Sequence, residues 1–311
     1  MKKINHTDCL VVIPTFYPGE KIINCINSIP KDYSIAIMDN GEDLELENII
    51  KTIPRKINHY KVGDIGLPKS FNLALDISDK NYIFITQPDV VLQKNCIENL
   101  LLAAKKYPRS GILCPLFYAG KLYSYYDFYD LKFNKKNFKL IKTKKIKNKK
   151  IFPSGDFCID AVNSTAILIK KNILLKIGKW DEKIYTYLED LDLSLRIRAT
   201  GHEIIKVYNS KVFHEGFQSH KEINKEVMNI SRNWHFCWSS IYFKKKHSNK
   251  VDFFVYFINI FLKCLWKSIV YFLLWRRSKF IENFTRLKAC LSFVICKESY
   301  FRPIIKKNDI Q

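Results

Sequence analysis

Short apolar runs alternate with stretches of helical spacing over the first third of the chain. The apolar runs are rich in β-branched residues, whereas the stretches between them repeat apolar residues three and four positions apart, as at Leu67, Phe71, Ala74 and Leu75. This alternation predicts parallel strands joined by crossover helices, and hence an α/β fold. We expect strands at 9–13, 34–39, 58–62, 82–86 and 111–117, and helices at 19–29, 43–51, 67–77 and 94–106.

The pattern breaks between residues 119 and 157, where a Tyr-rich stretch precedes the lysine-dense run from Lys132 to Lys150. We interpret 119–157 as a long excursion from the domain, and such excursions are usually functional or mobile. The core pattern then resumes, so residues 1–221 form one expected α/β domain. Its later elements are a strand at 161–169, a helix at 188–200 and a strand at 203–208.

The chain becomes helical, aromatic and basic from about residue 222. Within 252–275 the polar residues are confined to roughly an 80° arc of the expected helix, which leaves the rest of its circumference apolar. These polar residues are Asp252, Asn259, Lys263 and Lys267. A helix of this kind favours lying flat on a membrane surface. Spanning stays an alternative, because about 20 apolar residues suffice, although the two mid-segment lysines make it costly.

A second amphipathic helix is expected at 279–297. The basic groups Lys244–Lys246 and Arg276–Arg277 flank the first helix and supply cations for anionic headgroups. We therefore expect residues 222–311 to form a basic helical extension that associates with a membrane.

Composition sets the scale of the fold and the type of partner. The chain has 311 residues, of which 47% are hydrophobic, so it can bury the core of an α/β domain with an extension. Its formal net charge of +22 indicates that the protein has an anionic partner, but it does not indicate the fold. Nucleic acid, anionic lipid and nucleotide phosphate are the candidates.

The nine cysteines form no Cys-x-x-Cys pair, and several lie in apolar runs. This is typical of buried, reduced thiols rather than of a zinc cluster or a disulfide framework. The apolar run before Pro14 is too short for a signal segment, so we expect no export.

Five carboxylates stand where chemistry is expected. Asp39 and Asp89 follow predicted parallel strands, whose carboxyl ends share one cleft. Glu189, Asp190 and Asp192 open a predicted helix, where the helix dipole favours negative charge. Each could simply form a turn or start a helix. Together they fit a metal-bound diphosphate, with Asp89 on Mg²⁺ or Mn²⁺ and Asp190 as the base that takes a proton from an incoming hydroxyl.

A series of motifs carries a family resemblance over about residues 8–240. In chain order they are Val12-Ile13-Pro14-Thr15-Phe16, Met38-Asp39-Asn40-Gly41, Gly66 with Asn72, Gln87-Pro88-Asp89-Val90, Asn163-Ser164-Thr165, Gly178-Lys179-Trp180-Asp181-Glu182, and Tyr187 to Arg196. The series resembles that of family 2 glycosyltransferases, especially rhamnosyltransferase-like members. The resemblance implies the GT-A fold, a Rossmann-like, mostly parallel sheet with flanking helices, and inverting sugar transfer from a UDP- or dTDP-sugar.

The resemblance also implies roles for individual residues. The donor nucleotide would be bound by Pro14, Thr15, Asp39, Gly66, Asn72 and Gln87, with Asp39 accepting a hydrogen bond from the pyrimidine ring. Asp89 and His214 would hold the metal, Asp190 would be the base with Glu189 and Asp192 around it, and Trp180 and Asp181 would border the acceptor. His214 could instead be an ordinary hydrogen-bonded histidine, and Trp180 could be core packing. Gln87 stands where the family usually has Asn or Asp, and Asp64-Ile65-Gly66 replaces the commoner Asn-x-Gly.

The resemblance further implies a lipid-linked saccharide acceptor in surface polysaccharide biosynthesis. The expected location is cytoplasmic, peripheral on the inner face of the plasma membrane. The alternatives are a basic nucleic-acid-binding protein, a sugar nucleotidyltransferase, a non-enzymatic scaffold and a processive polysaccharide synthase. Missing signatures argue against three of them: no recognisable nucleic-acid-binding motif, a single glycine after the first strand, and no Q-x-x-R-W element. A scaffold would leave the acids of three separated segments without a shared purpose.

Overall fold

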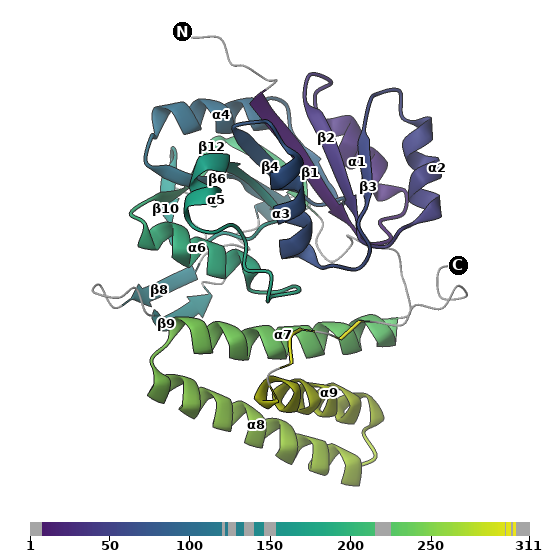
Figure 1. Cartoon of the computed structure of the whole chain (residues 1–311), viewed down its shortest axis with the longest axis vertical. Helices are drawn as coiled ribbons and strands as arrows, with labels where there is room; N and C mark the ends of the chain where they lie inside the picture. The colour runs from purple at the N-terminus through teal and green to yellow at the C-terminus, as the bar shows by residue number, and fades with distance from the viewer. Residues whose placement is uncertain are drawn as a thin grey trace. The chain divides into compact units, whose positions relative to one another are not determined.

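The chain divides into an α/β unit and a helical unit. The computed structural model describes residues 8–119, 122–123, 129–133, 140–145, 154–214, 225–295, 297–299 and 301–302 (Figure 1). The α/β unit comprises Met1–Leu131, Thr143–Trp180 and Asp190–Lys221, and the helical unit comprises Lys132–Lys142, Asp181–Glu189 and Glu222–Gln311. The short segment Asp181–Glu189 therefore groups with the helices, although the chain on both sides of it belongs to the α/β unit. Much of the Tyr-rich and lysine-dense stretch lies outside the described residues.

A ten-stranded sheet forms the centre of the α/β unit, with the path order β10-β12-β6-β11-β4-β1-β2-β3. Its strands are β1 (Cys9–Thr15), β2 (Ser34–Asp39), β3 (Asn58–Lys61), β4 (Tyr82–Thr86), β5 (Val90–Leu92), β6 (Ser110–Ala119), β7 (Leu122–Tyr123), β10 (Phe157–Ile159), β11 (Ala166–Lys170) and β12 (Glu203–His214). The β4-β1-β2-β3 half is parallel, whereas β11 runs antiparallel to both β4 and β6. A separate two-stranded sheet pairs β8 (Tyr129–Phe133) with β9 (Leu140–Lys145).

Helices cover both faces of the large sheet (Figure 1). They are α1 (Lys21–Ser28), α2 (Leu44–Thr52), α3 (Leu67–Ile77), α4 (Cys96–Lys106), α5 (Lys171–Lys176) and α6 (Glu189–Ala199). Successive residues of a strand point to opposite faces, so Val11 packs with α1 and α4 while Val12 packs with α3 and α6. The sheet is therefore buried on both sides, as its continuous apolar strands require.

The observed elements confirm most of the sequence-based prediction, with three differences. The strand expected at 161–169 begins only at Ala166, as β11, because residues 160–165 form a loop, and the short strand β10 before that loop was not predicted. The strand expected at 203–208 continues to His214, since its second half pairs with β5. The short elements β5 and α5 were not predicted, because three to six residues carry too little periodicity to be detected.

The helical unit contains three long helices, α7 (Lys225–His247), α8 (Lys250–Leu273) and α9 (Arg277–Val294). The last two confirm the helices expected at 252–275 and 279–297. Asn249 caps α8, since its side chain accepts a hydrogen bond from the Asp252 N–H at 2.8 Å. The core of this unit is aromatic and thiol-rich, and includes Trp234, Trp238 and Cys290. All described cysteines are free, and all except Cys158 are buried, as the sequence predicts.

Helix α8 exposes much of its apolar surface. Trp266 and Trp275 are 68% and 94% exposed. Further exposed apolar residues on or beside this helix are Val251, Phe254, Val255, Leu262, Leu265, Ile269, Phe272, Leu273 and Leu274. Among the described residues, α8 is the helix long and apolar enough to cross a bilayer, with a mean hydropathy of 1.6 over its most apolar window. Length and composition alone are weak evidence for a span, and the lysines within α8 oppose one.

Candidate active site

The carboxyl ends of three parallel strands lie at one edge of the sheet. The order is β4-β1-β2, and Thr15 at the end of β1 pairs with Asp39 at the end of β2. Pro14 precedes Thr15 within β1, and Gln87 and Asp89 follow β4 directly. Ligands of open α/β sheets bind outside this edge. The structure thus brings the strand-end residues predicted for donor and metal binding to one region.

Two buried hydroxyl groups lie at this edge of the sheet. Thr15 and Thr86, which end β1 and β4, are 2% and 0% exposed. Within the described part of the chain neither hydroxyl oxygen has a hydrogen-bond partner. A buried polar group left unsatisfied costs about 1–3 kcal/mol. A polar ligand that hydrogen-bonds these hydroxyls would recover that energy.

Asp89 and His214 come together beside this edge. Asp89 immediately precedes β5, and the first residue of β5, Val90, pairs with His214 at the end of β12. The His214 Nε2 lies 3.4 Å from the Asp89 Oδ2, and the two side chains are 15% and 2% exposed. Phe117 packs edge-on against the imidazole, with ring centroids 6.3 Å apart. A carboxylate beside an imidazole is a donor set that divalent metal ions accept.

The Asp39 carboxylate is engaged by its own surroundings. It is fully buried and accepts hydrogen bonds from the backbone N–H groups of Gly41 and Asp43, both at 3.0 Å. His59 on β3 lies 3.1 Å from its second oxygen. Asp39 therefore fixes the turn after β2, and its contact with a pyrimidine ring stays a prediction. His59 was not predicted, because its approach to Asp39 depends on the β2–β3 register, which sets Ile37 opposite His59.

Asn72 joins two parts of the α/β unit that lie far apart in sequence. Its side-chain amide donates to the Trp180 carbonyl and its carbonyl oxygen accepts from the Trp180 N–H, both at 3.0 Å. Trp180 is 2% exposed, and its ring centroid lies 5.1 Å from that of Phe71. Trp180 therefore belongs to the core, the alternative left open by the sequence. Asn72 holds the start of the following loop, and its role in donor binding stays a prediction.

Gly66 stands at the beginning of α3 with φ of 83°, a conformation that a side chain would strain. Its carbonyl accepts from the N–H and the hydroxyl of Ser70, at 3.1 and 2.8 Å. The Ser70 hydroxyl also reaches the Asn40 side chain at 2.9 Å. These contacts tie the loop after β3 to the loop after β2, beside the predicted donor site.

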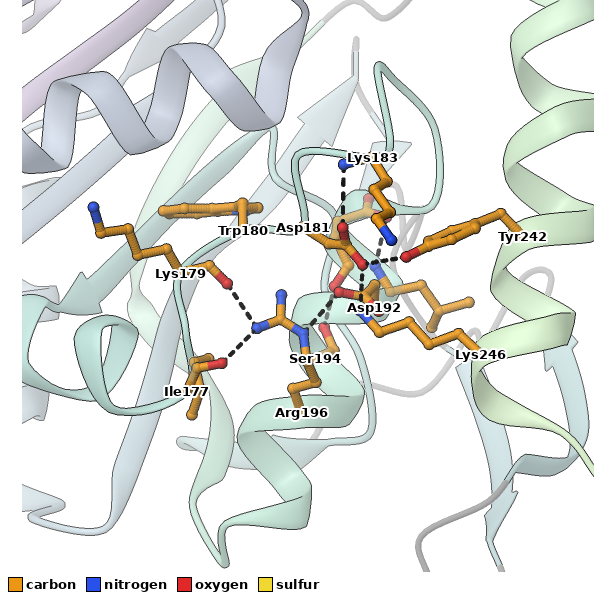
Figure 2. Close-up of polar contacts among 12 residues, drawn as sticks. Ile177, Lys179, Trp180, Asp181, Lys183, Asp192, Ser194, Arg196, Tyr242 and Lys246 are labelled. Atoms are coloured by element: carbon orange, nitrogen blue, oxygen red, sulfur yellow. Dashed lines mark hydrogen bonds and ion pairs between the residues drawn. The ribbon is translucent and has the colours of Figure 1, made fainter. Parts of the chain in front are cut away.

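The acidic helix start separates into groups with different surroundings. Glu189 is buried, whereas Asp190 is half-buried and accepts a hydrogen bond from the Leu191 N–H through its Oδ1. Asp192 is buried and accepts from the Arg196 Nε at 2.8 Å. Arg196 also donates to the carbonyls of Ile177 and Lys179 (Figure 2). Asp192 therefore forms a structural ion pair with Arg196. This pair was not predicted, although its i,i+4 spacing on a helix could have indicated it.

Asp190 is connected to the same edge of the sheet by hydrogen bonds. Ser194 donates to the Asp190 carbonyl at 2.7 Å, and its hydroxyl accepts from the Val162 N–H at 3.2 Å. Val162 lies in the loop that leads into β11, and β11 begins opposite Thr86, the last residue of β4. Ser194 thus anchors the first turn of α6 beside the loop at the carboxyl end of β4. Asp181, by contrast, bonds within the helical unit.

Among the residues that the structure describes, the metal prediction depends on the pair Asp89 and His214. Among the described residues, no group of three or more His, Cys, Asp or Glu side chains converges as a metal cluster. Asp89 and His214 would supply two ligands, so the remaining ones would come from donor phosphate oxygens and water, as is usual for Mg²⁺ or Mn²⁺.

Comparisons with known proteins give two sequence matches. Residues 10–162 match the family model described as Glycosyl transferase family 2. Rhamnosyltransferase WbbL of Escherichia coli (strain K12) is 22% identical over 242 residues, which cover 73% of this chain and 88% of that protein.

A solved structure with a TM-score above 0.5 supports the fold. A crystal structure of GalNAc-T7 with UDP, GalNAc and Mn²⁺ superposes with a TM-score of 0.53 at 14% identity and covers 66% of this chain but only 42% of that one. A structure of S. aureus TarS gives a TM-score of 0.48 at 13% identity, with 73% and 39% covered. The fold is GT-A, as predicted. The family-model match and the weak homology to WbbL support a family 2 glycosyltransferase that is rhamnosyltransferase-like.

Proposed function

We propose that this glycosyltransferase transfers a sugar from a UDP- or dTDP-sugar to a saccharide acceptor with inversion at the anomeric carbon. The observation that carries the proposal is the convergence of Asp89 and His214, 3.4 Å apart, beside the unsatisfied Thr15 hydroxyl at the carboxyl edge of the sheet. Similarity to a rhamnosyltransferase supports a deoxyhexose such as rhamnose as the transferred sugar. Donor identity and acceptor identity are both part of the proposal.

Asp89 and His214 fit a divalent metal by their chemistry. The carboxylate suits Mn²⁺ or Mg²⁺, and a single such carboxylate is enough when phosphate oxygens complete the coordination. A bound metal would supply charge neutralisation to the departing diphosphate. Thr15, at the end of the neighbouring strand, would hydrogen-bond the nucleoside through its buried hydroxyl. The crystal structure of GalNAc-T7, which has a similar fold, contains UDP and Mn²⁺ and is consistent with this assignment.

Asp190 is the proposed base. The acceptor hydroxyl oxygen attacks the anomeric carbon, the bond from that carbon to the donor diphosphate breaks, and its electron pair leaves with the diphosphate. The hydroxyl proton passes to the Asp190 carboxylate. Asp190 suits this role because it is half-buried at a helix start, where Ser194 and the Leu191 N–H fix its orientation. Glu189 and Asp192 complete its surroundings.

A membrane surface is the proposed location of the reaction. At 100° per residue, the exposed apolar side chains of α8 fall mainly within an arc of roughly 120°, and Lys263 lies beside this arc. Arg276 and Arg277 follow the helix. An apolar stripe with neighbouring cations matches the interface of an anionic bilayer. This supports a lipid-linked acceptor and a peripheral position on the inner face of the plasma membrane.

Calorimetry with UDP and dTDP tests the donor and metal assignments. We expect binding in the presence of Mn²⁺ or Mg²⁺ that weakens on addition of EDTA, and that weakens similarly in Asp89→Asn. Asp79→Asn is the matched control, because Asp79 is an exposed acid that is paired with Lys80 and precedes the amino end of β4, whereas Asp89 follows its carboxyl end. Equal affinity with and without EDTA would remove the metal from the mechanism. Absence of binding to either nucleotide would remove the proposed donor class.

A further inference from the structure

The segment Asp181–Glu189, which ends one residue before the proposed base Asp190, packs along one face of helix α7. Both belong to the helical unit. The α7 residues that contact the segment are Arg232, His235, Phe236, Ser239, Tyr242 and Lys246. Their spacings of three and four residues place them on a single helical face. We call these six residues the α7 template.

The first contact holds the beginning of the segment. The Asp181 Oδ2 accepts hydrogen bonds from the Tyr242 hydroxyl at 2.8 Å and from the Lys246 Nζ at 2.6 Å (Figure 2). Its Oδ1 accepts from the Lys183 N–H at 3.1 Å, which closes a turn. Burial by itself would raise the pKa of Asp181, but the hydrogen bond and charge of Lys246 outweigh it, and the pKa is lowered. The carboxylate is therefore ionised at neutral pH and ties the segment to α7.

The middle of the segment is held by contacts of the Tyr185 ring with His235 and Arg302. The Tyr185 ring stacks on His235, with centroids 4.3 Å apart, and the Arg302 guanidinium lies 3.8 Å from the Tyr185 centroid. His235 is itself fixed, since its Nε2 donates to the Phe301 carbonyl at 2.8 Å and its Nδ1 lies 2.9 Å from the Ser299 hydroxyl. Ser299 and Phe301, near the C-terminal end of the described residues, thus hold the His235 side chain of the template in place.

The last contacts hold a strained turn next to Asp190. Tyr187 and Leu188 are consecutive non-glycine residues, and both have φ of 67°. Such left-handed conformations are unfavourable for residues with a Cβ and persist where the surroundings impose them. The Ser239 hydroxyl donates to the Thr186 carbonyl at 2.8 Å. Tyr187 accepts a hydrogen bond from Arg232 and packs edge-on against Phe236.

We propose that the α7 template is a positioning device that imposes the turn at Tyr187 and Leu188 and thereby sets where Asp190 is presented to the acceptor hydroxyl. Lys246, Tyr242 and Ser239 are its positioning residues. The inference rests on the proposed function, because it assigns their effect to the base of that reaction. Under this proposal the C-terminal helices have a part in catalysis in addition to membrane attachment. Each contact of the α7 template restricts the segment that leads into α6.

The test compares variants that loosen the template with neighbours that do not touch the segment. In the full chain, Tyr242→Phe with Lys246→Met should lower kcat by about tenfold or more, the scale expected when a catalytic group is displaced by a fraction of an ångström. The nucleotide Kd should change by less than about twofold, because the strand-end residues are unaffected. Lys245→Met is the control, since Lys245 is exposed and lies over Phe293 instead. A protein with Lys246→Arg in place of Lys246→Met should recover most of the lost kcat, because arginine can still donate to the Asp181 carboxylate.

Two single serine substitutions, which are less disruptive than the double variant, test the same proposal with a lower risk of misfolding. Ser239→Ala removes the bond to Thr186, whereas Ser240→Ala removes a bond to Phe236 within α7 itself. Ser239→Ala should lower kcat and Ser240→Ala should leave it unchanged. Hydrogen exchange of residues 182–189 gives a readout that does not depend on activity. It should accelerate in the Tyr242→Phe, Lys246→Met protein and in Ser239→Ala, but not in Lys245→Met or Ser240→Ala.

The outcomes separate the two proposals. Faster exchange with unchanged kcat would overturn the positioning role, and unchanged exchange would overturn the template itself. A wild-type protein that transfers no sugar would overturn the proposed function before any variant is compared. Loss of kcat together with faster exchange, absent from Lys245→Met, is the result expected.

Discussion

The two units of this chain place polar and apolar residues in opposite ways. The α/β unit buries its apolar strands on both faces and keeps carboxylates such as Asp39 and Asp192 inside, each with named donors. The helical unit instead leaves large apolar side chains such as Trp266 exposed, while its buried His235 is neutral. The comparison shows a unit whose apolar side chains are buried around the candidate site, beside a unit with an exposed apolar surface, which we propose contacts a membrane.

The largest expected effect follows from Asp190, the half-buried acid of the α6 start. Asp190→Asn should lower the transfer rate by about 10²-fold or more, because the amide cannot accept the hydroxyl proton. Nucleotide affinity and thermal stability should stay close to those of the wild type, since the Ser194 bond uses the Asp190 backbone carbonyl. Steady-state kinetics with calorimetry measures both.

Asp192 provides the contrasting control two residues away. Asp192→Asn removes one charge of a buried ion pair whose partner Arg196 also holds the carbonyls of Ile177 and Lys179. Breaking such a pair costs about 3 kcal/mol, so this variant should unfold at lower temperature than Asp190→Asn. If Asp190→Asn kept full turnover, or if the two variants lost stability equally, the division into a chemical and a structural acid would be wrong.

The sequence predicted the α/β framework well because its signals are local. Runs such as 34–39 and 82–86 alternate with helical spacing, and both appear in the structure with those bounds as β2 and β4. The pairing of β5 with β12 could not be predicted in this way. It joins residues more than 100 positions apart, and it brings His214 to Asp89. For that contact the order of family motifs was the available guide.

In the candidate site, too, contacts between residues far apart in sequence could not be predicted. Asn72 and Trp180 were assigned from family motifs to the donor pocket and to the acceptor border. The structure joins them by two hydrogen bonds across 108 positions of sequence. Likewise, helix α7 was expected only as part of a helical tail. Its contacts with Asp181 and Tyr185 depend on side chains from three separate segments, and no periodicity within one segment encodes them.

His235 gives a prediction of intermediate size for the helical unit. Burial lowers its pKa from 6.5 to about 3, and the nearby Arg302 charge adds to this, against the Phe301 hydrogen bond. Because the folded pKa is depressed, the neutral form contributes stability that is present above pH 6.5 and lost as the pH falls toward 3. The slope is about 1.4 kcal/mol per pH unit, so about 2 kcal/mol is lost near pH 5.

Hydrogen exchange of α7 at neutral and mildly acidic pH measures this loss. His235→Gln is the matched variant, because its amide can still donate to the Phe301 carbonyl but cannot be protonated in this range. Its α7 protection should depend less on pH, even if it is lower throughout. A pH dependence as steep as that of the wild type would assign the effect to other groups.

The smallest expected effect tests the exposed face of α8. Lys263 is exposed on this helix, beside the apolar stripe that includes Trp266. One cation near an anionic membrane surface contributes about 1 kcal/mol, so Lys263→Gln should weaken binding to vesicles containing anionic lipid by about fivefold. Added salt should weaken the wild type in the same direction. Lys94→Gln makes the same change in net charge on the exposed Lys94 of the α/β unit and should leave binding unchanged. Equal losses in both variants would indicate a general effect of net charge, whereas resistance to salt and to carbonate extraction would favour a helix that spans the bilayer.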